Sequence, residues 1–447
     1  IPLAAVGFLS SKLSSSALNK NAVNQLSAVR GIKKANIETY FGERQGDMGV
    51  LNETVQTLRR EAIAKLQANR DNKKAQIERF FAERQGDALV LGDNPATRQA
   101  YKALYAAFAA GGGATGGKFK GHTGGKYTAP ASYRAVHDRF YGTFEYYMEQ
   151  YGYYDVFLMD AVKGDVFFTV TKEDDFGWRA SEYDSGLRDA WSIAVKEDRV
   201  AVSDTRTYAP SNGIPALFVA APIKEGNRTI GVVALQISID AITEIMGERS
   251  GLGETGETYL IGSDLLMRSD SFLDPEHHTV AASFADPSKG KVDTEAAAAV
   301  LAGKTGEDVI LDYNGNAVLS VYTPIDINSI RWGLIAEIDV AEAFVPKDEE
   351  GTYFYEKYVQ MYGYYDLFVI NPDGYVFYTA AQESDYQTNM VNGKYANSGL
   401  GKLVREVLQT KSFGFADFEP YAPSGDEPAA FVAQPIVNNG KIEAIVA

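Results

Sequence analysis

The chain has no cysteine, which excludes disulfide bridges, thiolate nucleophiles and zinc sites with cysteine ligands. Only four of its 447 residues are histidine, and none stands in the H-x-x-x-H or H-E-x-x-H spacing that places two metal ligands on one helix face. The G-x-S-x-G sequence of a nucleophile elbow is also missing. These absences predict a protein that is not an enzyme and that needs no metal and no cofactor.

A surplus of basic charge and a long apolar run are missing as well. The formal net charge is −16, and nucleic-acid binding depends on Lys and Arg that neutralise phosphates, so we expect no nucleic-acid partner. Crossing a bilayer takes about twenty apolar residues, and the uncharged stretch Ile1–Leu9 is only nine residues long. We interpret residues 1–9 as the end of a transmembrane helix that starts upstream. An ordinary apolar turn is the alternative.

Proline is absent from Ser10–Leu91, which is rich in Ala, Leu, Lys, Glu, Arg and Gln. These are strong helix formers, and apolar residues recur among them every three or four positions. The pattern predicts a long helical stalk over residues 10–110. Gly111 opens a glycine-rich loop whose first residues resemble a phosphate-binding loop, but Phe119 replaces the required Ser or Thr. We therefore expect a surface loop.

The stalk contains a repeat. KKANIETYFGERQGD (Lys33–Asp47) recurs forty residues later as KKAQIERFFAERQGD (Lys73–Asp87). We interpret the stripe formed by Ile37, Tyr40 and Phe41 as a helix–helix contact, which indicates a dimer. Two glycines near the end of the first copy leave open a break into separate helices.

A larger duplication organises the rest of the chain. YGYYDVFLMDAVKGDVFFT (Tyr151–Thr169) alternates apolar residues with period two around a Lys-Gly turn, which predicts a β-hairpin with one face on a core. It returns as YGYYDLFVINPDGYVFYT (Tyr362–Thr379), and YAPSNGIPALFVAAPI (Tyr208–Ile223) returns as YAPSGDEPAAFVAQPI (Tyr421–Ile436). Matched spacings in separate blocks predict a duplicated domain.

Each copy reads as a lead helix, a hairpin, a short helix and an antiparallel meander, which is an α+β plan with helices packed on a sheet. A shorter unit of similar strand order lies between the copies, with a predicted strand at Leu266–Ser269 and a helix that runs past Pro346 into the second copy. The predicted domains are the membrane-helix end 1–9, the stalk 10–110, a first module 130–250, a smaller second module 251–345, and a third module 346–447 that duplicates 130–240 and is cut at its C-terminal end.

These residues support a resemblance. The two hairpins, the SGL helices, the P-x-x-F-V-A-x-P-I strands and GETYLIGSDLLMRSDS resemble the double Cache domains, PAS-like extracytoplasmic sensors of bacterial and archaeal receptors. The stalk repeat resembles the segment that follows the first transmembrane helix of such receptors. The resemblance implies tandem modules with antiparallel sheets behind a long helix, and a small molecule held under the helical face of the first module. A third module is a departure from the common plan.

Candidate ligand-binding residues come from the first module. It offers an arginine that can bind a carboxylate through two parallel hydrogen bonds, aromatic side chains, and polar residues at the ends of strands. This combination is typical of a small-molecule site. The candidates are Tyr183, Arg188, Trp191, Asp204, Tyr208, Phe218 and Gln236. Asp204 and Tyr208 recur in the third module and could equally be scaffold. One Cache subfamily binds amino acids through an Asp on a late strand, but the late strand here offers the neutral Gln236, so we do not carry that specificity over.

The resulting hypothesis is the ligand-sensing ectodomain of a transmembrane chemoreceptor, methyl-accepting or otherwise, or of a sensor kinase. It would lie outside the cytoplasm, be anchored in the cell membrane by a flanking helix, form a homodimer, and signal through the stalk. The alternative is a structural or adhesive surface protein that uses Cache modules as spacers, with side chains filling every pocket.

Overall fold

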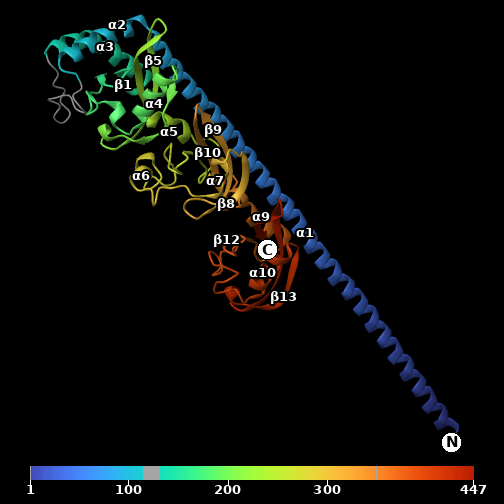
Figure 1. Ribbon diagram of the computed structural model, residues 1–447. Helices are drawn as coiled ribbons and strands as arrows, with labels where there is room; N and C mark the ends of the chain where they lie inside the picture. The colour runs from blue at the N-terminus through green and yellow to red at the C-terminus, as the bar shows by residue number, and fades with distance from the viewer. Residues whose placement is uncertain (1, 114–130, 349) are drawn as a thin grey trace. The chain divides into compact units, whose positions relative to one another are not determined.

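A computed structural model of the chain describes residues 2–113, 131–348 and 350–447 (Figure 1). Nearly all of the predicted glycine-rich loop, with Phe119 and His122, lies outside these residues. The chain divides into two compact units. We call Glu61–Ala343 the central unit, and Ile1–Arg60 together with Phe344–Ala447 the terminal unit.

The predicted stalk forms two helices. Helix α1 is uninterrupted over Pro2–Asp93, so the break that the glycines left open does not occur; each glycine costs a helix only about 1 kcal/mol, and strong helix formers flank both. Its residues are divided between the two units. Helix α2 spans Pro95–Ala110 and is capped by Asn94, whose Oδ1 accepts a hydrogen bond from the Ala96 N–H at 2.8 Å. Among the described helices, none has an apolar stretch that could cross a membrane.

The central unit begins with a six-stranded antiparallel sheet in the order β2-β1-β6-β5-β3, with β4 paired to β5. Its elements are α3 (Ala131–Tyr151), β1 (Tyr153–Asp160), β2 (Val166–Thr169), α4 (Gly186–Lys196), β3 (Ala201–Val202), β4 (Arg206–Thr207), β5 (Pro215–Glu225), β6 (Arg228–Ile237) and α5 (Ile239–Gly247).

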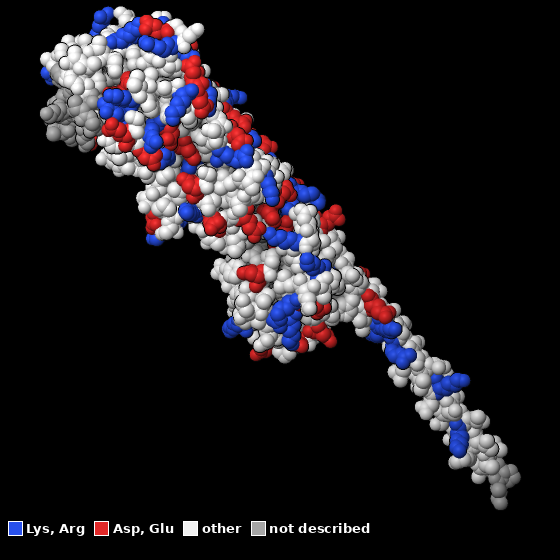
Figure 2. Space-filling model, in the orientation of Figure 1, with Lys and Arg blue, Asp and Glu red and all other residues white. Residues whose placement is uncertain are grey.

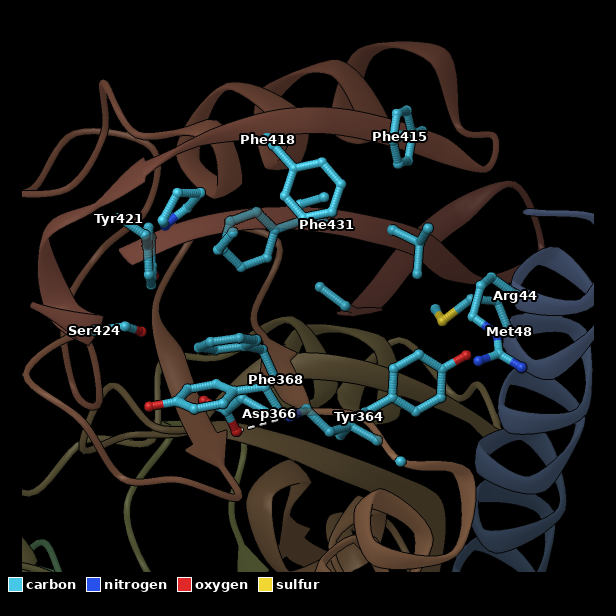
Figure 3. A pocket seen from close by; sticks show the side chains of 18 of the residues that line it. Arg44, Met48, Tyr364, Asp366, Phe368, Phe415, Phe418, Tyr421, Ser424 and Phe431 are labelled. Atoms are coloured by element: carbon cyan, nitrogen blue, oxygen red, sulfur yellow. Dashed lines mark hydrogen bonds between the residues drawn. The ribbon is translucent and has the colours of Figure 1, made fainter. Parts of the chain in front are cut away.

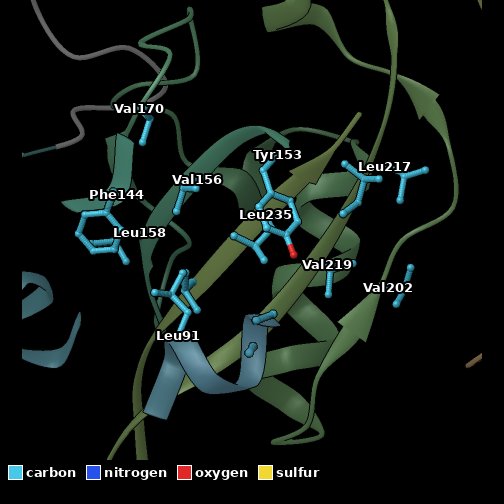
Figure 4. Packing of buried hydrophobic residues seen from close by; sticks show 14 of the residues in the cluster. Leu91, Phe144, Tyr153, Val156, Leu158, Val170, Val202, Leu217, Val219 and Leu235 are labelled. Atoms are coloured by element: carbon cyan, nitrogen blue, oxygen red, sulfur yellow. The ribbon is translucent and has the colours of Figure 1, made fainter. Parts of the chain in front are cut away.

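Strand alternation sends the side chains of this sheet to two different cores. Val156 and Leu158 point to the face covered by α1, α2 and α3, where Leu91 meets them (Figure 4). Phe157 and Met159 point to the opposite face, which α4 covers. Both faces are apolar because both are buried, and the period of two predicted for this hairpin follows from the pleat.

One close approach inside this unit gives a test of the packing. A Cβ added at Gly231 on β6 would lie 2.0 Å from the Tyr101 ring and 2.8 Å from the Met159 carbonyl oxygen. We expect Gly231→Ala to lower the free energy of unfolding by about 1–3 kcal/mol, as overpacking does. Gly142→Ala on α3, where a Cβ meets nothing within 4 Å, should instead stabilise by up to about 1 kcal/mol in the same urea titration. Equal effects of the two substitutions would contradict this.

A second, four-stranded sheet completes the central unit in the order β7-β10-β9-β8. Its elements are β7 (Glu257–Ile261), α6 (Val280–Ala285), α7 (Glu295–Leu301), β8 (Gly306–Leu311), β9 (Ala317–Ile327) and β10 (Ile330–Asp339). The strand predicted at Leu266–Ser269 is wrong. Only an isolated bridge joins Met267 to Ile261. The two hydrogen bonds beside it, from the Arg268 N–H to the Leu260 carbonyl at 2.7 Å and from the Gly262 N–H to the Leu266 carbonyl at 2.9 Å, do not continue into a ladder.

The terminal unit repeats the first sheet in the order β12-β11-β15-β14-β13. Its elements are α8 (Val340–Phe344, mostly in the central unit), α9 (Phe354–Tyr362), β11 (Phe368–Ile370), β12 (Val376–Thr379), α10 (Gly399–Thr410), β13 (Gly414–Tyr421), β14 (Glu427–Asn438) and β15 (Lys441–Val446). The helix predicted to run past Pro346 is wrong, since α8 ends at Phe344 and proline disfavours helix in the residue before it. The α+β class with antiparallel sheets is confirmed.

Candidate functional site

The two helix repeats dock two sheets through the same contacts. In the central unit, Tyr153 donates to Asp87 Oδ2 at 2.6 Å and Tyr147 donates to the Asp87 carbonyl at 3.2 Å. Arg84 bonds the same carboxylate at 3.3 Å and lies 5.3 Å from the Tyr153 ring centre. Burial and then the bond to Asp87 raise the pKa of Tyr153, so its hydroxyl stays a donor.

The terminal unit contains the matching set. Tyr364 donates to Asp47 Oδ2 at 2.7 Å, Tyr358 to the Asp47 carbonyl at 3.0 Å, and Arg44 pairs with Asp47 at 3.0 Å. The ring of Phe41 meets a ring of the sheet instead of another helix. Within the chain, the repeat thus positions a sheet domain, and the helix–helix contact of a dimer stays a prediction. Both YGYYD segments bond the helix repeat in the same way, but the first lies partly in β1 whereas the second precedes β11, which begins at Phe368.

Beneath α4 in the first module, four aromatic rings form a continuous wall. Trp178 stacks on Tyr183 with ring centres 4.2 Å apart and planes at 17°. It also lies 6.3 Å from Tyr208, which meets Phe218 edge-on at 5.0 Å. Tyr183, Tyr208 and Phe218 are thus brought together as the sequence predicted. Trp178 was not predicted.

Buried polar groups line this wall. Tyr208 donates to Asp175 Oδ2 at 2.9 Å, and Asp175 is fully buried. Gln236 on β6 lies opposite Phe218 on β5 and opposite Asp155 on β1. Asp175 Oδ1, Gln236 Oε1 and Trp178 Nε1 have no hydrogen-bond partner among the described residues. An unpaired buried polar atom costs about 1–3 kcal/mol, so such a group calls for water or a ligand.

The two aspartates of this site differ in their surroundings. Asp155 accepts hydrogen bonds from the Val170 N–H at 2.8 Å and from the hydroxyls of Thr169 and Thr171. Burial raises its pKa to about 6, and these donors oppose the rise. Burial, followed by the charge of Asp155, raises the pKa of Asp175 well above its ordinary value. Asp175 therefore offers the site a carboxyl that holds a proton more readily than a surface carboxylate.

The model of the Cache domain family matches residues 14–346. This chain belongs to the Cache domain family. The resemblance seen in the sequence is confirmed. The match ends where the predicted third module starts, so that module remains a Cache prediction from the internal repeat and its matching strand order. No curated protein matches the chain.

Solved structures of sensor domains show similarity at low identity. The ligand-binding domain of the Pseudomonas fluorescens chemoreceptor CtaA with L-serine is 14% identical, covering 61% of this chain and 93% of that chain, with a TM-score of 0.35. That of the Pseudomonas aeruginosa PAO1 chemoreceptor PctC with GABA is 15% identical, covering 61% and 96%, with a TM-score of 0.35. The periplasmic sensory domain of the Campylobacter jejuni chemoreceptor Tlp1 is 13% identical, covering 62% and 95%, with a TM-score of 0.38.

Three predicted site residues of this Cache chain lie away from the aromatic wall. Arg188 has a side chain that is 44% exposed and pairs with Asp184 at 3.4 Å. Trp191 donates through Nε1 to the Asp160 carbonyl at 2.8 Å and packs on the hairpin turn. Asp204 pairs with an arginine of the second module at 2.9 Å. The structure gives each a contact within the protein.

The sequence offered one signal for the residues that it missed. Trp178 stands where the third module has Thr388, whereas Asp175 matches Asp385. A tryptophan present in one copy only is the kind of difference that separates a ligand site from scaffold. Trp178 lies in a loop without periodicity, so no pattern around it indicates that its ring is buried.

The third module holds the cavity shown in Figure 3, with a volume of about 340 Å³. Aromatic rings from the sheet and residues of α1 surround it: Tyr40, Phe41, Arg44, Met48, Tyr364, Phe368, Phe415, Phe418, Tyr421 and Phe431 line it among others. Its lining includes Tyr421 and Phe431, the counterparts of Tyr208 and Phe218 in the wall beneath α4, together with residues of α1.

The second module buries two carboxylates side by side. Glu257 and Glu337 are direct cross-strand neighbours on β7 and β10, and each is at most 3% exposed. Tyr259 donates to Glu337 at 2.8 Å, while Ser271 donates to Glu257 at 2.8 Å. Burial raises the pKa of Glu337 to about 8. Within the described parts of the chain, no group of three or more metal-ligating side chains lies together here or elsewhere.

Proposed function

We propose that this chain is the ligand-sensing ectodomain of a transmembrane receptor, a chemoreceptor or a sensor kinase, and that its first module binds a small molecule against the wall beneath α4. The observation that supports this site is the set of buried polar atoms without partners: Asp175 Oδ1, Gln236 Oε1 and Trp178 Nε1. They combine hydrogen-bond donors and acceptors beside apolar rings, which is the usual makeup of a small-molecule pocket.

The chemistry of these groups describes the ligand. The Trp178 indole can only donate, and the Gln236 oxygen can only accept. The matching ligand is therefore a small polar molecule that both donates and accepts hydrogen bonds and has one flat or apolar side for the rings. In this proposal the chain lies outside the cytoplasm, and a helix flanking α1 anchors it in the membrane. The chain forms a homodimer, and ligand binding shifts an equilibrium between two conformations that is passed along α1.

The experiment is thermal denaturation against a panel of small acids, amines and purines. A ligand at one hundred times its Kd stabilises the folded state by about 2.7 kcal/mol, so it raises Tm. We expect Trp178→Ala to weaken binding of that compound at least tenfold, because it removes the stacked ring and its indole donor. Arg188→Ala, on the surface beside Asp184, should leave Kd within about twofold.

The outcome separates two versions of the site. Loss of binding with Arg188→Ala but not with Trp178→Ala would favour the site predicted from the sequence over the one built from the structure. A panel without any stabilising compound counts against sensing. It would favour the second candidate, a structural spacer, which one observation supports: Tyr421 donates to Asp385 at 2.6 Å as Tyr208 does to Asp175, so this pair also serves as scaffold.

A further inference from the structure

The aromatic wall beneath α4 is almost closed to solvent. Trp178 is 8% exposed, and Tyr208 and Phe218 are each 1% exposed. Tyr183 is half-buried, and its ring stacks on that of Trp178 with centres 4.2 Å apart. A small molecule can therefore reach the Trp178 indole only after part of this wall moves. Of the four rings, that of Tyr183 both meets water and covers the indole.

The segment that carries Tyr183 has few anchors of its own. We call Ser181–Asp184 the Tyr183 segment. It begins in the short 3₁₀ turn Ala180–Glu182, and the Tyr183 N–H donates to the Ala180 carbonyl at 3.2 Å within that turn. The Ser181 hydroxyl fixes the start of the segment by donating to the Lys163 carbonyl at 2.8 Å. Exposed segments with local hydrogen bonds open at a low free energy, so this segment is the part of the wall that moves most easily.

Asp184 ties the end of the Tyr183 segment to strand β4. Arg206 of that strand donates from Nη1 and Nη2 to the two oxygens of Asp184, at 3.2 and 2.6 Å. Its Nη1 also donates to Asp189 of α4 at 2.9 Å, and Arg188 adds a longer contact of 3.4 Å to Asp184. The two-bond fork fixes the orientation of the segment. The side chains of Arg206 and Asp184 are 39% and 69% exposed, so water and salt compete with the fork and it can open.

The third module shows which part of this arrangement is scaffold. Lys402 and Glu419 stand in place of Asp189 and Arg206, and they pair at 2.8 Å with the charges reversed. A link between the short helix and the strand is thus kept in both copies. The residue before the SGL serine, however, is Asn397 instead of an aspartate. The tie from the strand to the tyrosine segment therefore belongs to the first module, where the proposed ligand site lies.

We propose that the Tyr183 segment is a gate over the ligand site beneath α4, and that Arg206 is the latch that holds this gate closed through Asp184. When the fork opens, Tyr183 leaves the face of Trp178, and a small molecule gains access to the indole and to the buried polar atoms beside it. When the fork forms again, the segment covers the bound molecule.

This inference rests on the proposed ligand site. It is tested by measuring access to Trp178 without any ligand, so failure of the gate and failure of ligand binding are different results.

The probe is acrylamide, a small neutral molecule that quenches tryptophan fluorescence on contact. The three tryptophans of the chain are each at most 8% exposed, so quenching of the wild type should be weak. Asp184→Asn replaces the charged partner of Arg206 with an amide that cannot accept both bonds of the fork. We expect its quenching constant to rise at least twofold. Trp178→Phe added to this variant should abolish the rise, because Trp191 and Trp332 lie outside the wall.

A matched control separates the latch from any other exposed ion pair. Glu197→Gln breaks the pair of Glu197 with Arg199 at 2.7 Å, which is similarly exposed and lies in the same module, and the variant should quench like the wild type. Urea titration should give the same free energy of unfolding for wild type and both variants, because the gate opens locally. The gate is overturned if Asp184→Asn quenches like Glu197→Gln, or if the rise persists when Trp178 is replaced.

Discussion

Replacing Arg268 with alanine is expected to lower the free energy of unfolding of the central unit by about 3 kcal/mol. Breaking a buried ion pair by removing one partner costs about 3–5 kcal/mol, because the other charge is left without compensation. The Asp204 side chain keeps 26% of its surface exposed, so water compensates part of the loss and the lower end of that range applies. Urea titration of the chain, followed by hydrogen exchange in β5 and β10, measures the effect.

Two further variants show whether the loss comes from this pair. Asp204→Asn combined with Arg268→Met removes both charges of the buried pair and should recover most of the stability, as apolar replacement of a buried pair often does. Asp264, which Arg268 also contacts at 3.1 Å, keeps 42% of its side chain exposed to water. Arg331→Ala breaks the pair with Asp326 at 2.7 Å, whose side chains are 46% and 58% exposed, and should leave the free energy of unfolding almost unchanged, because water screens such a pair. An effect of Arg331→Ala as large as that of Arg268→Ala would contradict the assignment.

The sheets could be predicted from the sequence because their signal is local. Alternation in Tyr151–Thr169 reports the pleat, and repetition of the whole block at Tyr362–Thr379 predicts a second sheet of the same type. Asn94 and Pro95 marked a helix boundary through capping and backbone geometry alone. Each of these signals lies within a few residues along the chain, which is the range over which propensity and turn chemistry act.

The contacts of Arg268 and Trp332 with Asp204 could not be predicted, for the opposite reason. Arg268 and Asp204 are 64 residues apart, and Trp332 reaches the same carboxylate from 128 residues away. No periodicity links such residues, so the sequence leaves ligand contact and scaffold equally open for Asp204, whereas the structure pairs its carboxylate with Arg268. The stripe of Ile37, Tyr40 and Phe41 has the same limit: apolar spacing indicates that a face is covered but does not say what covers it.

Glu337→Gln is expected to change the pH dependence of stability more than any other single substitution in the second module. Burial raises the pKa of Glu337 to about 8, against about 4.3 for glutamate in an unfolded chain. Between these pH values the folded state holds the proton and the unfolded state has lost it. The unfolded state binds fewer protons, so stability falls as pH rises through this window.

The size and direction of the change follow from that difference. The slope for Glu337 reaches about 1.4 kcal/mol per pH unit, because between these pH values the two states differ by one bound proton. Burial is the main cause of the raised pKa, and the like charges of Glu257 and Asp312 add to it. The neutral amide of Glu337→Gln carries no such penalty. The variant should match the wild type near pH 5 and exceed its free energy of unfolding near pH 8.

Urea titrations at several pH values from 5 to 8.5 measure the two profiles. Burial also raises the pKa of Asp339, to about 6. The free energy of unfolding of both proteins therefore still falls as pH rises, but less steeply in the variant. Glu244→Gln, which removes an exposed carboxylate on α5, is the matched control and should follow the wild type. Parallel profiles for wild type and Glu337→Gln would show that Glu337 is already ionised in the folded state.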